Sequence, residues 1–183
     1  MTRPLRKDAA DRRKALLAAA RAVFETEGID APLDQIAERA GVGRATLYRN
    51  FPGRTEIALA VLLDDVTELA ERFAEPRDPL AFLRFLEALS ERLVRNTALG
   101  GAVRAAPSPE ILKPLRTAMI EAATPALIVS QAAGAVRADL TPADVRVLSA
   151  MLGAGLHNAA PGERTAMAKR TLELVLDAIK ARP

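Results

Sequence analysis

Apolar residues recur along most of this chain at intervals of three and four positions, which is the spacing of one face of an α-helix. In the first such segment, residues 8–27, Leu16, Ala20, Val23 and Phe24 share one side. No segment alternates apolar and polar residues in the manner of a half-buried β-strand. The pattern therefore predicts an all-α protein.

Two short helices joined by a glycine-containing turn are predicted next. The first ends at Gly41-Val42-Gly43, because glycine readily adopts the positive φ that closes a helix. The second spans residues 44–51 and keeps Leu47 and Phe51 on its inner side. Its outer side is rich in hydrogen-bond donors and has no carboxylate, with the residues Arg44, Ala45, Thr46, Tyr48, Arg49 and Asn50. This arrangement is typical of a helix-turn-helix whose second helix enters the major groove of DNA.

Longer helices are predicted for the rest of the chain, over residues 54–74, 80–99, 114–133, from Thr141 onward, and over 164–181. The 80–99 segment is apolar on much of its circumference, so we expect it to be buried or to line a cavity. Pro125 is expected to kink or divide the 114–133 helix, because proline lacks the N–H group that a helix interior uses.

Composition narrows the classes of function. The chain has no cysteine and one histidine, His157, which excludes disulfides, thiolate metal sites and multi-histidine metal sites. The motifs H-E-x-x-H and G-x-S-x-G and a phosphate-binding loop are absent from the sequence. We therefore expect no enzymatic activity, no catalytic residue, no metal and no cofactor. His157 is interpreted as a partly buried helix residue, with a ligand-sensing group as the alternative.

Charged residues interrupt every apolar run well before the roughly 18 residues that a membrane-spanning helix needs. No signal-like segment is found either. We therefore expect a cytoplasmic protein with no membrane partner.

Charge is unevenly divided along the chain. Residues 1–54 hold eleven Lys and Arg against seven Asp and Glu, a net charge of +4 in a chain whose total is +3. Such a basic excess beside a helix-turn-helix is expected of a DNA-binding end. Six of these cations lie in residues 1–14, which are interpreted either as a solvated terminus or as an arm that contacts DNA.

Residues 36–54, IAERAGVGRATLYRNFPGR, resemble the DNA-binding signature of the tetracycline-repressor (TetR) family. The matching positions are Ile36-Ala37, Ala40-Gly41-Val42, Thr46-Leu47-Tyr48 and Phe51, within a resemblance that extends from about Leu16 to Val61. The sequence departs from the common pattern at Gly43, where serine is usual, and at Ala31-Pro32, where a pair of threonines is usual. Arg54 stands where lysine is usual.

The resemblance implies a bacterial transcriptional repressor that binds an inverted-repeat operator in double-stranded DNA as a homodimer. It also implies release by a small ligand, and the apolar 80–99 segment indicates a hydrophobic one. A helical DNA-binding regulator with no small-molecule effector is the alternative. The implied domains are an N-terminal three-helix DNA-binding domain, residues 1–53, and a larger helical effector-binding and dimerisation domain, residues 54–183. Following the family pattern, Tyr48 and Arg54 are expected to contact phosphate. Arg44 is expected to read a base, because its guanidinium can donate two hydrogen bonds to the edge of a guanine.

Two further sets of residues complete the predicted sites. The effector pocket is predicted to comprise Phe73, Phe82, Phe85, Leu89, Met119 and Met151, although apolar residues at helical spacing also form ordinary core. The dimer interface is predicted on the last two long helices, at Leu148, Leu152, Leu156, Leu172, Val175 and Ile179. The alternative is that both apolar stripes pack in the subunit's own core. Gly153-Ala154-Gly155 is expected either to permit close helix packing or to interrupt the helix.

Overall fold

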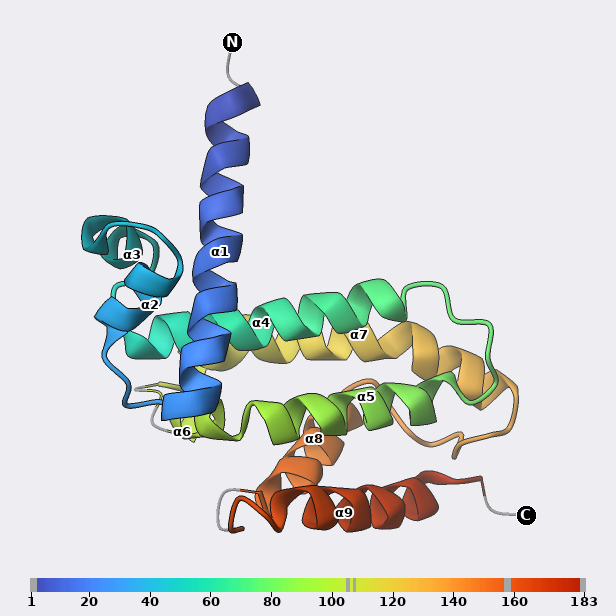
Figure 1. Cartoon of the computed structure of the whole chain (residues 1–183). Coiled ribbons are helices and arrows are strands. Elements are labelled where there is room, and N and C mark those ends of the chain that lie inside the picture. Colours follow the sequence, from blue (N-terminus) through green and yellow to red (C-terminus); the bar gives the residue numbers. More distant parts are fainter. Residues whose placement is uncertain (1–2, 105, 107, 157–158, 182–183) are drawn as a thin grey trace.

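The computed structural model describes residues 3–104, 106, 108–156 and 159–181 (Figure 1). Within these residues the chain is helical, with no β-strand beyond an isolated antiparallel bridge between Val136 and Lys180. The α-helices are α1 (Arg3–Glu27), α2 (Leu33–Arg39), α3 (Arg44–Asn50), α4 (Arg54–Arg72), α5 (Ala81–Arg95), α6 (Gly100–Arg104), α7 (Lys113–Ala132), α8 (Asp144–Ala154) and α9 (Arg164–Ile179). Two 3₁₀ segments, η1 (Thr97–Leu99) and η2 (Pro109–Leu112), precede α6 and α7. The predicted all-α fold is confirmed.

The first hydrophobic core forms where α1 packs against α2 and the beginning of α4. Leu47 and Phe51, on the inner side of the predicted second helix, are buried in it. The turn between α2 and α3 contains Gly41 at φ +66°, a left-handed conformation that residues with a Cβ adopt only with strain. The largest side chains of this core include Leu16, Val23, Phe24, Ile36, Leu47, Phe51, Ile57 and Val61.

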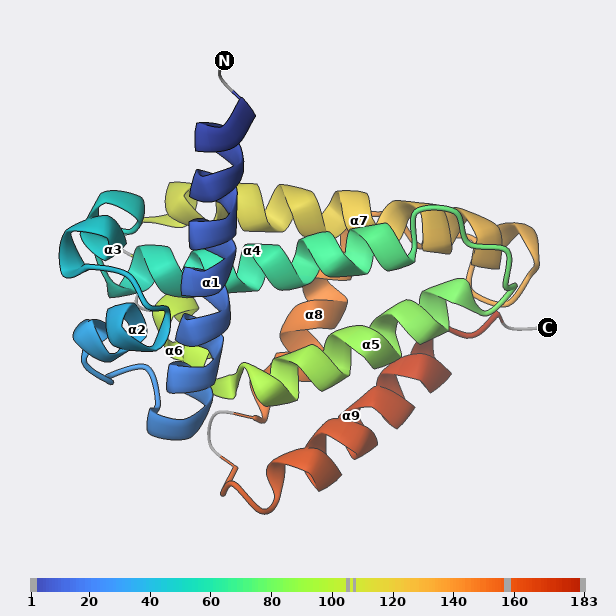
Figure 2. The ribbon, with the colours of Figure 1, turned by 45° about the horizontal axis from the view of Figure 1, so that its top comes forward.

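Helix α1 begins at Arg3, earlier than the predicted start at residue 8. The backbone of the basic N-terminal segment therefore continues the helix, and α1 projects beyond the body of the molecule in two views (Figures 1 and 2).

The second hydrophobic core is formed by the C-terminal half of α4 together with α5, α7, α8 and α9. Helices α4 and α7 lie side by side, and α5 packs against both α7 and α9 (Figure 2). Phe85 is central: its ring meets the edge of Phe73 at 5.5 Å between centroids and stacks with Phe82 at 6.4 Å. Apolar residues of the 80–99 segment are thus buried in this core, as predicted.

Helix α7 runs without a break from Lys113 to Ala132 although it contains Pro125. Ala122, Ala126 and Leu127 are buried around the proline. We attribute the continuity to this packing, which outweighs the roughly 3 kcal/mol that a proline costs inside a helix. The predicted division of the helix at Pro125 is therefore wrong, while the alternative, a kink at this residue, stays a prediction.

Helix α4 belongs to both cores. Its first half contributes Ile57 and Val61 to the first core, and its second half contributes Leu69 to the second. Leu99 of η1 and Ala102 of α6 also lie in the first core, although they follow α5 in the sequence. The predicted domain boundary after residue 53 stays a prediction. The structure adds that the two cores share a helix and a connecting segment.

Candidate nucleic-acid interface and cavity

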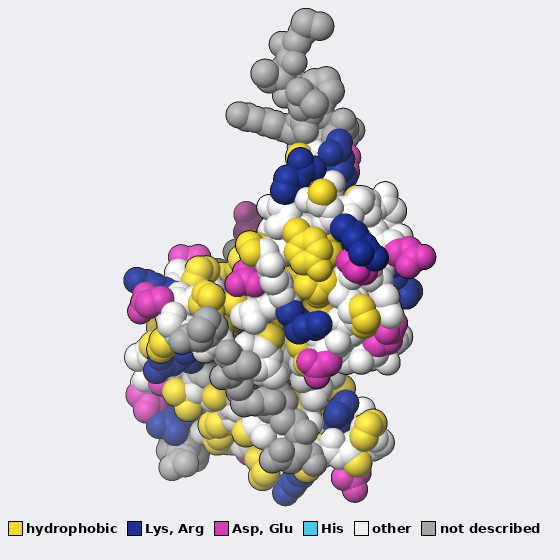
Figure 3. Space-filling view, turned by 90° about the vertical axis from the view of Figure 1, so that its left-hand side faces the viewer, with side chains coloured by type: hydrophobic (Ala, Val, Ile, Leu, Met, Phe, Trp, Pro, Cys, Tyr) yellow, Lys and Arg dark blue, Asp and Glu magenta, His cyan; other side chains and the backbone are white. Residues whose placement is uncertain are grey.

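The outer face of α3 lies at the end of the molecule that Figure 3 presents. Its exposed residues are Arg44, Ala45, Tyr48, Arg49 and Asn50, with Thr46 half-buried beside them. Tyr48 leaves 46% of its surface in solvent, which is high for a large, mainly apolar side chain. Lys and Arg side chains at this end are interspersed with acidic ones (Figure 3). The structure thus brings the six residues predicted on α3 to one surface of mixed charge.

Local contacts orient several of these side chains. Arg49 Nη2 donates to Thr46 Oγ1 at 3.2 Å, and Asn50 Nδ2 donates to the Thr46 carbonyl at 2.8 Å. Arg44 Nη2 lies 3.0 Å from Asp34 Oδ2 on α2, while 74% of the Arg44 side chain remains exposed. Exposed ion pairs contribute only about 0–1 kcal/mol, so a nucleic acid can compete for this guanidinium.

Arg54 has a different environment from the one predicted for it. Its Nη1 donates to the carbonyls of Ile29 and Ala31, 2.6 Å from the latter, in the loop between α1 and α2. The side chain therefore fixes this loop from the start of α4. Its predicted contact with phosphate stays a prediction.

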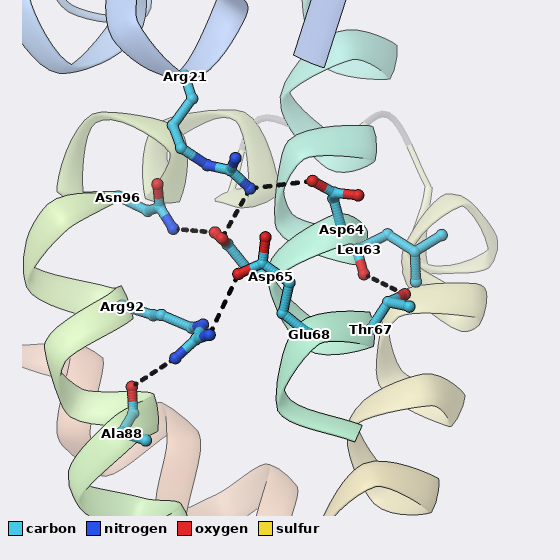
Figure 4. Close-up of polar contacts among 9 residues, drawn as sticks. All are labelled: Arg21, Leu63, Asp64, Asp65, Thr67, Glu68, Ala88, Arg92 and Asn96. Atoms are coloured by element: carbon cyan, nitrogen blue, oxygen red, sulfur yellow. Dashed lines mark hydrogen bonds and ion pairs between the residues drawn. The ribbon is translucent and has the colours of Figure 1, made fainter. Parts of the chain in front are cut away.

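A polar network joins α1, α4 and the end of α5 (Figure 4). Arg21 Nη2 on α1 donates to Asp65 Oδ1 at 2.8 Å and to Asp64 Oδ2 at 3.2 Å, both on α4. Asp65 is buried and also accepts a hydrogen bond from the side-chain amide of Asn96. Burial lowers the pKa of Arg21, but Asp65 and Asp64 outweigh it and leave the pKa raised. The network fixes Arg21 in its charged form against α4.

Arg92 lies on α5 near this network, and its own hydrogen bonds are longer than those of Arg21 (Figure 4). Its Nη2 is 3.3 Å from Glu68 Oε2, and its Nη1 is 3.5 Å from the Ala88 carbonyl. Its Nε is buried and has no hydrogen-bond partner among the described residues. Only 12% of the Arg92 side chain is exposed. Arg92 is therefore a largely buried guanidinium whose donors are incompletely paired, which is costly unless a further acceptor is bound.

A cavity of about 550 Å³, partly open to solvent, lies between α4, α5, α7 and α8. Its walls are largely apolar, with Leu62, Val66, Leu69, Leu93, Leu115 and Met119 among the lining residues. Polar side chains in the lining include Asp65, Arg92, Asn96, Arg116, Arg146 and Ser149. The volume falls in the range of about 300–1,000 Å³ that is common for small-molecule sites.

The cavity includes two of the six predicted pocket residues, Leu89 and Met119. Phe73, Phe82 and Phe85 are instead buried in the second core, where their rings pack on one another. Met151 is exposed on α8. The spacing of apolar residues thus predicted which helices surround the cavity. It did not predict the lining itself, because the aromatic side chains pack in the second core.

The predicted dimer-interface residues are also inside the subunit. Leu148, Leu152, Leu156, Val175 and Ile179 are buried, and Leu172 packs against the same core half-buried. These side chains thus pack in the subunit's own core, as in the alternative, and a dimer interface on these two helices stays a prediction. The exposed apolar side chains on these two helices are different ones: Val147 and Met151 on α8, and Met167 and Leu174 on α9.

Gly155 follows the end of α8, at the point where α9 approaches it. A Cβ at this position would lie 2.5 Å from Met167 Sδ, so the glycine permits close packing of the methionine side chain. Helix α8 ends at Ala154, and both predicted roles of the Gly153-Ala154-Gly155 segment therefore apply.

Two models of protein families match this chain. Residues 16–61 match "Bacterial regulatory proteins, tetR family", and residues 76–181 match "Transcriptional regulator SbtR-like, C-terminal domain". The second match alone spans more than half of the chain. The chain belongs to the TetR family.

Similar proteins cover this TetR-family chain to different extents. The TetR transcriptional regulator SCO0520 from Streptomyces coelicolor is 30% identical, with a TM-score of 0.65 over 93% of this chain and 99% of its own. A TetR regulator from Mycobacterium vanbaalenii is 26% identical, with a TM-score of 0.68 over 97% and 100% of the two chains. The HTH-type regulator TtgW of Pseudomonas putida is 43% identical over 63 residues. That match covers 34% of this chain and 47% of TtgW, so it spans less than half of the curated relative.

Membership of the TetR family places the chain among transcriptional regulators with a helix-turn-helix. No described helix of this TetR-family protein is both long enough and apolar enough to cross a membrane. The two interpretations of His157 concern a residue that lies outside the described part of the chain.

Sequence reasoning missed the network of Arg21, Asp64, Asp65 and Asn96 in this TetR-family protein. One signal for it exists. Asp65 occupies the inner register of α4, four positions after buried Val61 and four before buried Leu69. A carboxylate on such a stripe must be paired when it is buried, which points to a cation on a neighbouring helix.

Proposed function

We propose that this protein binds an inverted-repeat DNA operator as a homodimer and represses transcription until a small apolar effector occupies the cavity. One observation carries the proposal of effector control. Asp65 lines the cavity and also accepts a hydrogen bond from Arg21 of α1, the first helix of the DNA-binding core. A molecule in the cavity can therefore contact Asp65, and through it affect the position of α1 in that core.

DNA binding is assigned to the outer face of α3, which carries donors and no carboxylate. Arg44 is proposed to read a base edge, and Tyr48 and Arg54 to contact phosphate. Two copies of α3 related by a two-fold axis would enter successive major grooves about 34–36 Å apart, or a multiple of that distance. An inverted-repeat operator matches this symmetry.

Dimerisation is assigned to the exposed apolar faces of α8 and α9. Val147 and Met151 lie four positions apart on α8, and Met167 and Leu174 lie seven apart on α9, so each pair shares one side of its helix. Large apolar side chains that one chain leaves in solvent can be covered by the same surface of a second chain. The proposed interface thus lies beside the buried stripes predicted from the sequence.

Effector action is proposed to run through the wall shared by the cavity and the DNA-binding core. Asn96 and Gly100 line the cavity, while Leu99 between them is packed in the first core. A ligand that shifts this segment or Asp65 would change how α1 and the start of α4 are held. It acts only if it favours the arrangement that binds DNA poorly, since equal affinity for both arrangements shifts nothing. A 10- to 100-fold loss of operator affinity corresponds to roughly 1.4–2.8 kcal/mol of coupling.

The test begins with selection of DNA fragments from the source genome by the purified protein. We expect recovered fragments to share an inverted repeat, and a promoter carrying it to give less transcript when the protein is added. Compounds are then screened for loss of this binding and for an increase in thermal midpoint. Failure to recover any specific fragment would overturn the DNA-binding assignment.

Specific binding that no compound alters, in a broad screen, would instead favour the alternative of a regulator without an effector. The two parts of the proposal are thus separated by the same set of measurements.

A further inference from the structure

We propose that the effector is an apolar monoanion, a carboxylic acid with a hydrocarbon body, whose carboxylate binds the guanidinium of Arg92. This inference rests on the proposed effector function of the cavity. It identifies the chemical class of the ligand and the residue that holds it.

Arg92 offers the donors that such a ligand needs. A guanidinium has five N–H donors in a planar fork that fits a carboxylate through two parallel hydrogen bonds. In Arg92 these donors make contacts at 3.3 Å and 3.5 Å, at or beyond the long end of the usual range, and the buried Nε has no partner among the described residues. A carboxylate from the cavity side would supply short, charge-assisted bonds to a group that is already largely desolvated.

The charge of the cavity wall selects against a cation. Three arginines are among its lining residues, the largely buried Arg92 and the exposed Arg116 and Arg146, against one acidic residue, Asp65. Asp65 already accepts hydrogen bonds from Arg21 and Asn96, so its negative charge is largely compensated. A cationic guest would meet this positive excess beside a largely apolar wall, whereas an anion would be attracted by it.

Glu68 is the acidic residue closest to the proposed anchor. Its carboxylate lies 3.3 Å from Arg92 Nη2, but 53% of its side chain is exposed, so water screens the pair. Glu68 is also absent from the cavity lining. A ligand carboxylate approaching from the cavity can therefore replace this contact while Glu68 turns fully into solvent.

The rest of the cavity lining determines what chemistry the remainder of the ligand must have. Apolar residues from four helices form most of the wall, including Leu69 of α4, Leu93 of α5, Leu115 of α7 and Ala154 of α8. Buried apolar surface contributes about 25 cal/mol per Å², so a hydrocarbon body supplies affinity while one charged end supplies orientation. A ligand with several charges would leave some of them against leucine side chains, which is costly.

The experiment compares ligands that share a body and differ in one end. The probes are decanoate, decanol and decylamine, together with phenylbutyrate and phenylbutanol. Binding to the full-length protein is measured by calorimetry and by the shift in thermal midpoint. For the wild type we expect the acids to bind at least about tenfold more tightly than the alcohols, and the amine to bind worst.

Variants of α5 identify the anchor. We expect Arg92→Met to lose the preference for acid over alcohol while it still binds the alcohol. Arg95→Met is the matched control, since Arg95 lies on the same helix, is exposed and does not line the cavity. It should behave as the wild type. Arg92→Gln serves as a second variant if the methionine substitution impairs folding, which operator binding would reveal.

Each outcome bears on one claim. Equal affinity of the wild type for acids and alcohols, or an unchanged acid preference in the Arg92 variants, overturns the inference. Tight binding of the alcohol or amine, with no binding of the acids, overturns it as well but leaves the proposed effector function intact. If no probe binds and no other compound changes operator affinity, the effector function itself fails.

Discussion

The guanidinium of Arg54 holds the loop that leads from α1 into α2. Because its Nη1 donates to the carbonyls of Ile29 and Ala31, the side chain stabilises the entry to the helix-turn-helix. Hydrogen bonds from a charged donor contribute about 1.5–3 kcal/mol. We predict that Arg54→Ala lowers the thermal midpoint and the operator affinity together, as measured by calorimetry and by a salt titration of DNA binding.

Arg49→Ala is the matched control for this prediction. Arg49 is exposed and, among the described residues, donates a hydrogen bond only to Thr46 within α3. Its loss should therefore weaken DNA binding without lowering the thermal midpoint. An Arg54→Ala protein as stable as the wild type would contradict the anchoring role.

Arg44 is the residue for which we predict a change in base preference. Its side chain is 74% exposed, and its ion pair with Asp34 is weak enough to exchange for a base edge. Arg44→Ala should cost about 1–3 kcal/mol of operator affinity and relax the preference at one base pair in each half-site. Competition binding with operators randomised one position at a time measures this. A uniform loss across all positions would mean that Arg44 contacts only phosphate.

The residues of α3 could be assigned from sequence because helical spacing decides which side of a short helix faces the core. Leu47 and Phe51 fix that side, and Tyr48 and Arg49 must then point away from it. Arg54 and Asp65 could not be assigned in the same way. Their partners, the Ala31 carbonyl and Arg21, come from other parts of the chain, and only the folded arrangement brings them together.

At the scale of helices, α8 and α9 offer an apolar surface that one chain leaves uncovered. We predict that Leu174→Glu or Met151→Glu yields monomers with poor operator affinity, because a buried carboxylate without a partner disfavours association. Sedimentation velocity measures the change. Ile128→Glu on α7 is the control: Ile128 is equally exposed but lies outside the proposed interface, so this variant should remain a dimer. If the first two variants remain dimers, the interface does not include Leu174 and Met151, and this assignment is wrong.

Helix positions were predictable where local signals agree. The start of α8 is an example: a helix was predicted from Thr141 onward, and α8 begins at Asp144, whose carboxylate accepts the Thr141 backbone N–H at 2.7 Å. The partner of an apolar stripe was less predictable. Leu152 and Val175 have the spacing of an interface, yet they pack in the core of their own subunit. Periodicity gives the direction in which a side chain points but not which surface it meets.

At the scale of the whole molecule, Asp65 connects the cavity to α1. We predict that Asp65→Asn retains operator binding but responds less to an effector, because the charge that holds Arg21 is removed while the shape of the side chain is kept. The measurement is operator affinity with and without the effector found by screening. Asp64→Asn is the control, since Asp64 binds Arg21 at a longer distance and does not line the cavity. A full response in Asp65→Asn would exclude this route.

Leu99 and Ala102 complete the first core from a point in the chain that lies beyond α5. The two segments that match family models, residues 16–61 and 76–181, are therefore separable in sequence but not in folding. We predict that a fragment ending at residue 75 melts well below the intact chain, because truncating a buried leucine such as Leu99 alone costs about 2–5 kcal/mol. The intact chain should unfold in one transition, and two separate transitions would contradict this. For the same reason, a relative's DNA-binding segment can replace residues 16–61 of this protein only if the segment that carries Leu99 and Ala102 is exchanged with it.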